Sequence, residues 1–326
     1  MAVPNILITS AAAKVLLVHA FQEAAWPYGG RVFACDAEPD SAALFVADEA
    51  RVVPRLDDPA FADAFAALCA ESKIALVVPT RDGELEALAA LAPRLAAAGT
   101  RMLAAPAETL RLCRDKRRFN AFCLEHGFAV AKIFSGEEIP PFPVFVRPAS
   151  GAGGRGARRI DDEAAWNALG EARRDMVVQE VIEAPEYTVD ALLDLTGKPL
   201  QAVARRRLLV KAGEAVKSRV EDIPDLAAAA LDLCARLGCI GHNVVQAFHT
   251  PKEGTRFIEV NPRFGGASNL SIKAGLDSPV RIVQMIRGET EAAARPRPIA
   301  FGLTMLRHAA NILVPDAALA AVPRTL

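Results

Sequence analysis

This 326-residue chain has no excess of charge of either sign. Its 38 Lys and Arg residues nearly balance its 39 Asp and Glu residues, and the formal net charge is −1. Because non-specific binding of nucleic acid needs a basic surface, this balance argues against a nucleic-acid-binding protein. Hydrophobic residues make up 52% of the chain and charged residues 24%, so a large core can form and disorder is not expected.

Cysteine pairs and long apolar runs are also missing. No Cys-x-x-Cys pair and no Cys/His cluster with zinc-like spacing occurs among the six cysteines: Cys35, Cys69, Cys113, Cys123, Cys234 and Cys239. The uncharged runs near residues 6–13 and 237–251 fall short of the ~20 residues that a membrane-spanning helix needs. The first five residues carry no basic segment typical of a signal peptide. We therefore expect a cytoplasmic protein with reduced thiols.

Several nucleotide-binding signatures are absent. No Gly-Lys-Ser/Thr follows the Gly-rich segment at 151–156, which excludes a Walker A loop, and neither His-Arg-Asp nor Asp-Phe-Gly of protein kinases occurs. Gly151, Gly153 and Gly156 match the dinucleotide pattern GxGxxG formally. That pattern, however, follows the first strand of a dinucleotide-binding domain, whereas here it lies mid-chain between two expected strands. A dinucleotide-dependent oxidoreductase is therefore a low-ranking alternative.

Residues 1–105 alternate between expected strands and helices. Apolar runs predict strands at 5–9, 31–35, 74–79 and 101–105, and helices are expected at 11–25, 59–71 and 82–97. This order predicts a parallel sheet with helices on both faces, whose ligands bind at the carboxyl ends of the strands. Asp36 ends the second strand, where a capping role is favoured over a ribose contact.

Polar residues cluster at the end of an expected strand at 255–261. Residues two apart on a strand share a face, so Glu259 and Asn261 project together, and Arg263 follows if the extended backbone continues past Pro262. Carboxylate and amide oxygens suit Mg²⁺, and the guanidinium fork suits a phosphate. A turn at 252–254 brings Gln246 near Glu259. The alternative is an edge strand whose polar residues are solvated.

Other segments indicate anion binding less specifically. Four glycines within 151–156 allow backbone N–H groups to close around a phosphate, although a long connecting hairpin is the alternative. Residues 107–125, which precede the Gly-rich segment, are expected to form one helix that carries Lys116. Four further cations on expected strands are candidates for holding an acidic substrate, although solvated strand charges explain them equally well: Arg205, Arg207, Lys217 and Arg219.

Taken together, five motifs in order resemble the ATP-grasp superfamily, and within it the large subunit of carbamoyl phosphate synthetase. They are Asp115-Lys116, Arg147-Pro148 before the Gly-rich segment, Gln179-Glu180-Val181-Ile182 followed by Glu186, Gln246, and Glu259-x-Asn261-Pro262-Arg263. The resemblance implies an α/β and α+β fold. An N-terminal open parallel α/β domain at 1–105 would precede a two-subdomain ATP-grasp module, at 106–182 with the Gly-rich flap and at 183–326 with the metal and phosphate site.

The resemblance also implies roles for individual residues. Lys116 and Arg147 would contact the phosphates of ATP, Glu186 would hold its ribose, and Arg263 would stabilise the transferring phosphoryl group. The remaining sets are the flap (Gly151, Gly153, Gly154, Arg155, Gly156), the adenine hinge (Gln179, Glu180, Val181, Ile182) and the ligands of Mg²⁺, with Mn²⁺ as an alternative (Gln246, Glu259, Asn261).

The implied activity is that of an ADP-forming ligase that activates a small carboxylate as an acyl phosphate for attack by an amine. The expected partners are these small molecules, with no nucleic acid or membrane, and a homodimer is the expected assembly if one forms. A non-catalytic ATP-binding regulatory protein is the alternative, against which the intact Glu259, Asn261 and Arg263 argue. Two departures stand out: many relatives have Lys at the position of Arg147, and one module instead of two argues against complete carbamoyl phosphate synthesis.

Overall fold

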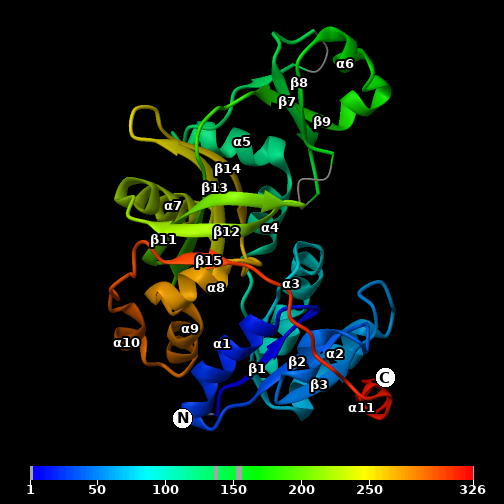
Figure 1. Cartoon of the computed structure of the whole chain (residues 1–326). Helices are drawn as coiled ribbons and strands as arrows, with labels where there is room; N and C mark the ends of the chain where they lie inside the picture. The colour runs from blue at the N-terminus through cyan, green and yellow to red at the C-terminus, as the bar shows by residue number, and fades with distance from the viewer. Residues whose placement is uncertain (1–2, 136–138, 152–155, 326) are drawn as a thin grey trace.

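The computed structural model describes residues 3–135, 139–151 and 156–325, which form three β-sheets (Figure 1). A parallel sheet comes first and two antiparallel sheets follow, which confirms the expected α/β and α+β class. The limits of the three expected domains stay predictions. Among the described residues, none of the helices has both the length and the apolar character to span a membrane.

The N-terminal sheet has five parallel strands in the order β3-β2-β1-β4-β5. Its elements are β1 (Asn5–Ile8), α1 (Val15–Ala25), β2 (Val32–Asp36), β3 (Glu49–Val52), α2 (Phe61–Glu71), β4 (Ile74–Val78), α3 (Asp82–Ala97) and β5 (Arg101–Met102). Ile6 and Ile8 pack with α1 on one face, whereas Leu7 packs with α2 and α3 on the other. The prediction of helices on both faces is therefore confirmed, and β3 is an additional edge strand.

The segment after this sheet differs from its prediction. Instead of one helix at 107–125, two helices form, α4 (Ala107–Arg114) and α5 (Lys116–Glu125). Asp115 between them has an extended backbone with φ −94° and ψ 110°, and its carboxylate accepts hydrogen bonds from the N–H groups of Arg117 and Arg118. This side-chain cap satisfies the first free N–H groups of α5 and so begins a new helix.

A four-stranded antiparallel sheet follows, in the order β6-β9-β7-β8. Its elements are β6 (Ile133–Phe134), β7 (Val144–Pro148), β8 (Arg158–Ile160), α6 (Glu163–Asn167) and β9 (Met176–Glu180). Val144, Val146, Ile160, Trp166 and Val178 form its core, which holds α6 against the sheet at the top of Figure 1.

The six-stranded sheet β14-β13-β10-β11-β12-β15 carries most of the candidate site. Its strands are β10 (Glu186–Leu193), β11 (Pro199–Lys211), β12 (Glu214–Glu221), β13 (His242–Thr250), β14 (Gly254–Asn261) and β15 (Thr304–Leu306). One face is apolar, because Val189, Val245 and Val260 pack there with helix α7 (Pro224–Arg236). Residues alternate between faces along each strand, so the other face carries the polar residues of β10, β13 and β14.

The last part of the chain returns to the N-terminal sheet. After α8 (Ser268–Ser271), α9 (Ser278–Ile286) and α10 (Thr290–Ala294), the chain passes through β15 and descends to α11 (Asp316–Ala320) beside β3 (Figure 1). Val52 of β3 donates to the Pro323 carbonyl at 2.8 Å, and the Thr325 N–H donates to the Val52 carbonyl at 2.8 Å. The tail therefore covers the edge of the N-terminal sheet.

Candidate active site

Three of the predicted site residues meet at the end of the β13–β14 hairpin. Gln246 lies directly opposite Glu259 in the antiparallel register, as the turn at 252–254 predicts. Glu259 Oε1 accepts a hydrogen bond from Gln246 Nε2 at 3.2 Å and another from Asn261 Nδ2 at 3.1 Å. One carboxylate and two amides therefore form a compact set of oxygen-bearing side chains on the polar face of the sheet.

Two cations reach this set from the preceding part of the chain. Arg147, on β7, donates from Nη2 to the Ile258 carbonyl of β14 at 3.2 Å. Lys116, at the start of α5, donates from Nζ to the Gly151 carbonyl at 3.0 Å. Burial lowers the pKa of both groups, and the Glu259 carboxylate opposes that shift in each case. Both cations therefore lie within electrostatic reach of Glu259, as a phosphate site would require.

The residues present fit a magnesium–phosphate group. Arg147 Nε is buried and has no hydrogen-bond partner among the described residues, so a donor is free at this point. Mg²⁺ is commonly held by one or two carboxylates with phosphate oxygens completing its shell, and Glu259 with the amide oxygens of Gln246 and Asn261 offers such a set. Within the described part of the chain, no cluster of three or more His, Cys, Asp and Glu side chains offers another metal site.

The expected adenine hinge borders a cavity of about 530 Å³. Glu180, Val181 and Ile182 line it, together with Phe134 and Phe142 from the neighbouring strand and loop. Glu180 is anchored by Arg256 Nη1 at 2.8 Å and by the Lys132 N–H at 2.9 Å. Gln179, by contrast, is buried with 6% of its surface exposed.

The flap is only partly described. Gly151 has φ +118° and Gly156 has φ +77°, conformations that favour glycine. At Gly156, an added Cβ would also lie 3.3 Å from Pro148 Cγ. Gly153, Gly154 and Arg155 lie outside the described residues, so their predicted phosphate contacts stay predictions.

Arg263 follows β14 two residues after Asn261, and its guanidinium has a partner that the sequence did not indicate. Its Nε and Nη2 each donate to an oxygen of Asp82 at 2.5 Å, so a carboxylate from the start of α3 holds the fork bidentately. Its Nη1 donates to the Phe264 carbonyl at 3.0 Å, and Nη2 also reaches Asn261 Oδ1 at 3.4 Å. Helix α3 of the N-terminal part therefore contributes a residue to the candidate site.

The structure corrects three of the four substrate-binding predictions. Arg205 is 1% exposed, and its Nε donates to Asp190 at 2.6 Å, so it cannot reach a substrate. Lys217 and Arg219 lie on the face opposite Glu259, because Arg219 pairs with Arg206, which in turn pairs with Tyr187 of the apolar face.

Arg207 shares the polar face with Arg205 but is paired with a residue of the predicted ATP site. It forms an ion pair with Glu186 at 3.1 Å. Burial raises the pKa of Glu186, and Arg207 opposes that shift. The predicted ribose ligand and the predicted acid ligand are therefore neighbours, and their roles stay predictions.

A buried polar network lies behind the Arg263 loop. Asp190, fully buried on β10, accepts hydrogen bonds from Arg205 Nε, His242 Nε2 at 3.1 Å, Ser268 Oγ at 2.7 Å and Ser271 Oγ at 2.5 Å. Burial opposes ionisation of Asp190, but Arg205 and His242 outweigh it and hold its pKa well below the usual range.

Two contacts join this network to the loop. The Gly265 N–H donates to Ser268 Oγ at 2.9 Å, and Phe264 stacks on His242 with ring centroids 4.1 Å apart. The network thereby fixes the turn that follows Arg263. The alternation of Glu186, Thr188 and Asp190 along one strand is the signal that could have indicated it.

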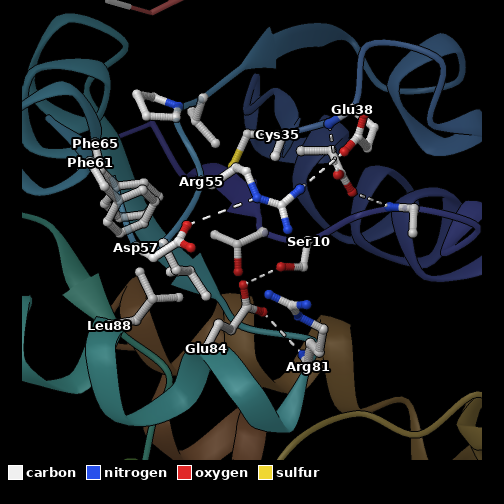
Figure 2. Close-up of a pocket in the computed structure, with 17 residues that line it drawn as sticks. Ser10, Cys35, Glu38, Arg55, Asp57, Phe61, Phe65, Arg81, Glu84 and Leu88 are labelled. Carbon is white, nitrogen blue, oxygen red and sulfur yellow. Dashed lines mark hydrogen bonds and ion pairs between the residues drawn. The ribbon is translucent and has the colours of Figure 1, made fainter. Parts of the chain in front are cut away.

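A second cavity, of about 450 Å³, lies in the N-terminal part at the carboxyl ends of β1, β2 and β4. Figure 2 shows Phe61, Phe65 and Leu88 along one wall, with Arg55 between Glu38 and Asp57. Asp36 lines this cavity and accepts hydrogen bonds from the N–H groups of Ala12 and Glu38, which lie outside helices. It does not cap a helix, because Lys14 and Ser41 occupy the N-cap positions of the neighbouring helices. None of the lining residues belongs to the predicted ATP site.

Two family models match this chain. Residues 6–103 match the PylC-like N-terminal domain, and residues 172–307 match the ATP-grasp domain of a biosynthetic pathway associated with the Ter operon. The carbamoyl phosphate synthase large chain of Gemmatimonas aurantiaca is 27% identical over 224 residues, which cover 61% of this chain and 20% of the relative. The chain thus spans about a fifth of that relative's length.

Solved structures show the same fold. Biotin carboxylase from Campylobacter jejuni superposes with a TM-score of 0.70 at 16% identity, covering 92% of this chain and 74% of that one. L-amino acid ligase from Bacillus licheniformis gives 0.68 at 19% identity, covering 90% and 77%. An ADP complex of N5-carboxyaminoimidazole ribonucleotide synthetase gives 0.69 at 15% identity, covering 93% and 81%. The chain therefore contains a PylC-like N-terminal domain and an ATP-grasp domain.

Proposed function

We propose that this protein is an ATP- and Mg²⁺-dependent ligase that forms ADP and joins a small carboxylic acid to an amine. A carboxylate oxygen attacks the γ-phosphorus of ATP, and ADP leaves with the electron pair of the broken P–O bond. The amine nitrogen then attacks the acyl carbon of the resulting acyl phosphate. Phosphate leaves, and the nitrogen loses a proton.

This proposal rests on one observation: Lys116 and Arg147 lie within electrostatic reach of Glu259, which is hydrogen-bonded to Gln246 and Asn261. When Mg²⁺ is bound by the first three, it supplies charge neutralisation between phosphate groups. Lys116 and the free Nε of Arg147 would hold phosphate oxygens from the opposite side. No covalent nucleophile of the enzyme is needed for such a reaction.

The relatives support the class of reaction. L-amino acid ligase and N5-carboxyaminoimidazole ribonucleotide synthetase share the fold over at least 90% of this chain. By name, the first of these acts on L-amino acids and the second makes a ribonucleotide, and neither name transfers to this chain. The acid and the amine therefore have to be found by assay.

The test is a screen for ADP release with Mg²⁺–ATP over a panel of carboxylates crossed with a panel of amines. We expect release that needs both partners in wild type and is lost in Glu259→Gln, which keeps the side-chain shape but removes the charge. Binding of Mg²⁺–ATP without turnover across the whole panel would instead favour the non-catalytic nucleotide-binding alternative.

A further inference from the structure

The cavity of about 450 Å³ in the N-terminal part lies at the carboxyl ends of β1, β2 and β4 (Figure 2). In the strand order β3-β2-β1-β4-β5, the chain runs outward from β1 to β3 and then crosses back to β4 on the other side of β1. In open α/β sheets, ligands bind at such a reversal, outside the carboxyl ends of the strands. Small-molecule sites have volumes of about 300–1,000 Å³, so the cavity has both the place and the size of a ligand site.

Helix α3 separates this cavity from the candidate ATP site. Glu84 and Leu88, four residues apart on one face of the helix, line the cavity. Asp82, which holds Arg263, comes two residues before Glu84. Two residues along an α-helix lie about 200° apart around its axis, so Asp82 leaves the opposite side of α3. The cavity is therefore separate from the surroundings of Arg263.

One wall of the cavity is apolar. Phe61 and Phe65 of α2 stack with ring centroids 5.4 Å apart and an interplanar angle of 23°. Leu88 continues this wall on α3 (Figure 2). Aromatic and aliphatic side chains are the usual lining for the hydrocarbon part of a ligand, and stacked rings suit an aromatic one.

The charged side chains that line the cavity carry a surplus of two negative charges. They are four carboxylates and two guanidinium groups: Asp36, Glu38, Asp57 and Glu84, with Arg55 and Arg81. Glu38 and Asp57 are exposed at the rim, where they flank Arg55 at 3.3 and 3.9 Å.

Glu84 is the buried carboxylate of this set, with 2% of its surface exposed. Its Oε1 accepts from the N–H groups of Thr80 and Arg81, and its Oε2 accepts from the hydroxyl of Ser10. All three donors are neutral, and no cation within the described ranges forms an ion pair with Glu84. A buried carboxylate without a counter-charge favours a cationic group in the cavity beside it.

Thr9, at the end of β1 next to Ser10, adds a free hydrogen-bonding group. Its side chain lines the cavity and is 3% exposed. Its Oγ1 is buried and has no hydrogen-bond partner in the part of the chain that the structure describes. Because buried polar groups are nearly always paired, this oxygen indicates a partner that those residues do not provide.

The turn after β1 does not favour an anion. In dinucleotide-binding folds, free N–H groups of this turn and of the following helix hold a phosphate. Here the Ala11 N–H donates to the Cys35 carbonyl at 3.1 Å, and the Ala12 N–H donates to Asp36 Oδ2 at 2.8 Å. A carboxylate already pairs with the turn, and a phosphate beside it would be repelled.

We propose that this cavity is a second ligand site, which binds a small molecule made of an ammonium group and an apolar body, preferably aromatic. The body lies against Phe61 and Phe65, and the ammonium donates to Glu84 Oε2 and Thr9 Oγ1. Oε2 accepts one hydrogen bond, from Ser10, and a carboxylate oxygen has room for another. The site does not depend on the proposed ligase function, so a failed screen for ADP release would leave it standing.

The test compares three probes that share a ring and differ in charge: 2-phenylethylamine is a cation, 2-phenylethanol is neutral and phenylacetate is an anion. Each is titrated against the full chain by ligand-observed NMR, with and without a saturating amount of Mg²⁺ and the non-hydrolysable ATP analogue AMP-PNP. Glu84→Gln removes the buried charge, and Thr9→Val removes the unpaired hydroxyl while keeping the shape. Glu71→Gln is the control, since Glu71 is an exposed carboxylate at the end of α2 outside the cavity.

We expect the amine to bind wild type more tightly than the alcohol, and phenylacetate to bind most weakly. Glu84→Gln should weaken amine binding about tenfold or more and Thr9→Val about threefold or more, whereas Glu71→Gln should match wild type. Thr9→Val should not lower Tm, because the hydroxyl has no partner to lose. A purely structural role of Thr9 would not weaken binding in a variant of unchanged stability.

Three results would overturn the proposal. One is an amine that does not bind wild type, or binds no better than the alcohol. Another is unchanged amine affinity in either cavity variant, and if Glu84→Gln does not fold, Thr9→Val alone decides. The third is displacement of the amine by AMP-PNP, which would place the amine in the ATP site.

Discussion

Replacing Arg205 by Met should destabilise the protein strongly, because it leaves the Asp190 carboxylate buried without its main counter-charge. Arg205 is 1% exposed and its Nε lies 2.6 Å from an oxygen of the fully buried Asp190. Breaking a buried ion pair on one side costs about 3–5 kcal/mol. Arg205 Nη1 is buried without a hydrogen-bond partner, which already destabilises the wild type. Removing this donor therefore offsets about 1 kcal/mol or more of the loss. The remaining hydrogen bonds of Asp190 lessen the loss further, so we expect a net loss of about 2–3 kcal/mol.

The assay is urea denaturation of the full chain, followed by circular dichroism at pH 7 and pH 4. The pKa of Asp190 is depressed in the folded protein, so its contribution to stability is present above the unfolded value of about 3.9 and is lost as the pH falls. In Arg205→Met the same carboxyl is buried without that cation, and its pKa should rise. The difference in stability between wild type and variant should therefore be larger at pH 7 than at pH 4.

The matched control is Lys217→Met, since Lys217 is an exposed cation on a neighbouring strand. It should change the free energy of unfolding by less than about 0.5 kcal/mol. Two results together would contradict this reasoning: Arg205→Met as stable as Lys217→Met, and the same difference in stability from wild type at pH 4 as at pH 7. The buried ion pair would then not stabilise the fold as its geometry indicates.

Four further predictions concern the candidate site. Glu259→Gln should abolish ATP turnover while circular dichroism shows an unchanged fold, and near-normal turnover at low Mg²⁺ would contradict the metal assignment. Substituting Gly153 and Gly154 together by Val should weaken ATP binding, measured by calorimetry, with little change in Tm, whereas unchanged affinity would make the flap only a connector. Arg263→Ala should lower kcat about 10²–10³-fold with little change in KM, and Arg263→Lys should not rescue it because a point charge lacks the fork. Asp82→Asn should lower kcat in the same direction by a smaller factor, and normal kcat there would show that the clamp on Arg263 has no part in turnover.

Much of the site could be predicted from the sequence because its parts are local. Glu259 and Asn261 share a face since they are two apart on one strand, and a short turn brings Gln246 opposite Glu259. The strand and helix order of the first hundred residues likewise predicted a parallel sheet covered on both faces. The motif order also indicated the ATP-grasp domain that a family model matches at residues 172–307.

The sequence did not show which side chains of β11 and β12 lie on the same face of the sheet as Glu259. Alternation predicts that Arg205 and Arg207 share a face of β11, and that Lys217 and Arg219 share a face of β12. It does not say which of these faces carries Glu259. That is set by the register of β11 against β10 and of β10 against β13, and it placed Lys217 and Arg219 on the far side. Burial then separated Arg205, held by Asp190, from Arg207.

The sequence by itself therefore determined the residue types, their spacing and the local hairpin that gathers Glu259, Gln246 and Asn261. Only the tertiary structure decided what Arg263 touches, because its partner Asp82 lies 181 positions away in the chain. It also placed Phe21 of helix α1 against Phe264, in the loop that follows Arg263. Such contacts depend on how helices α1 and α3 dock on a loop of another sheet, and docking is governed by the packing of whole faces rather than by any local pattern of residues.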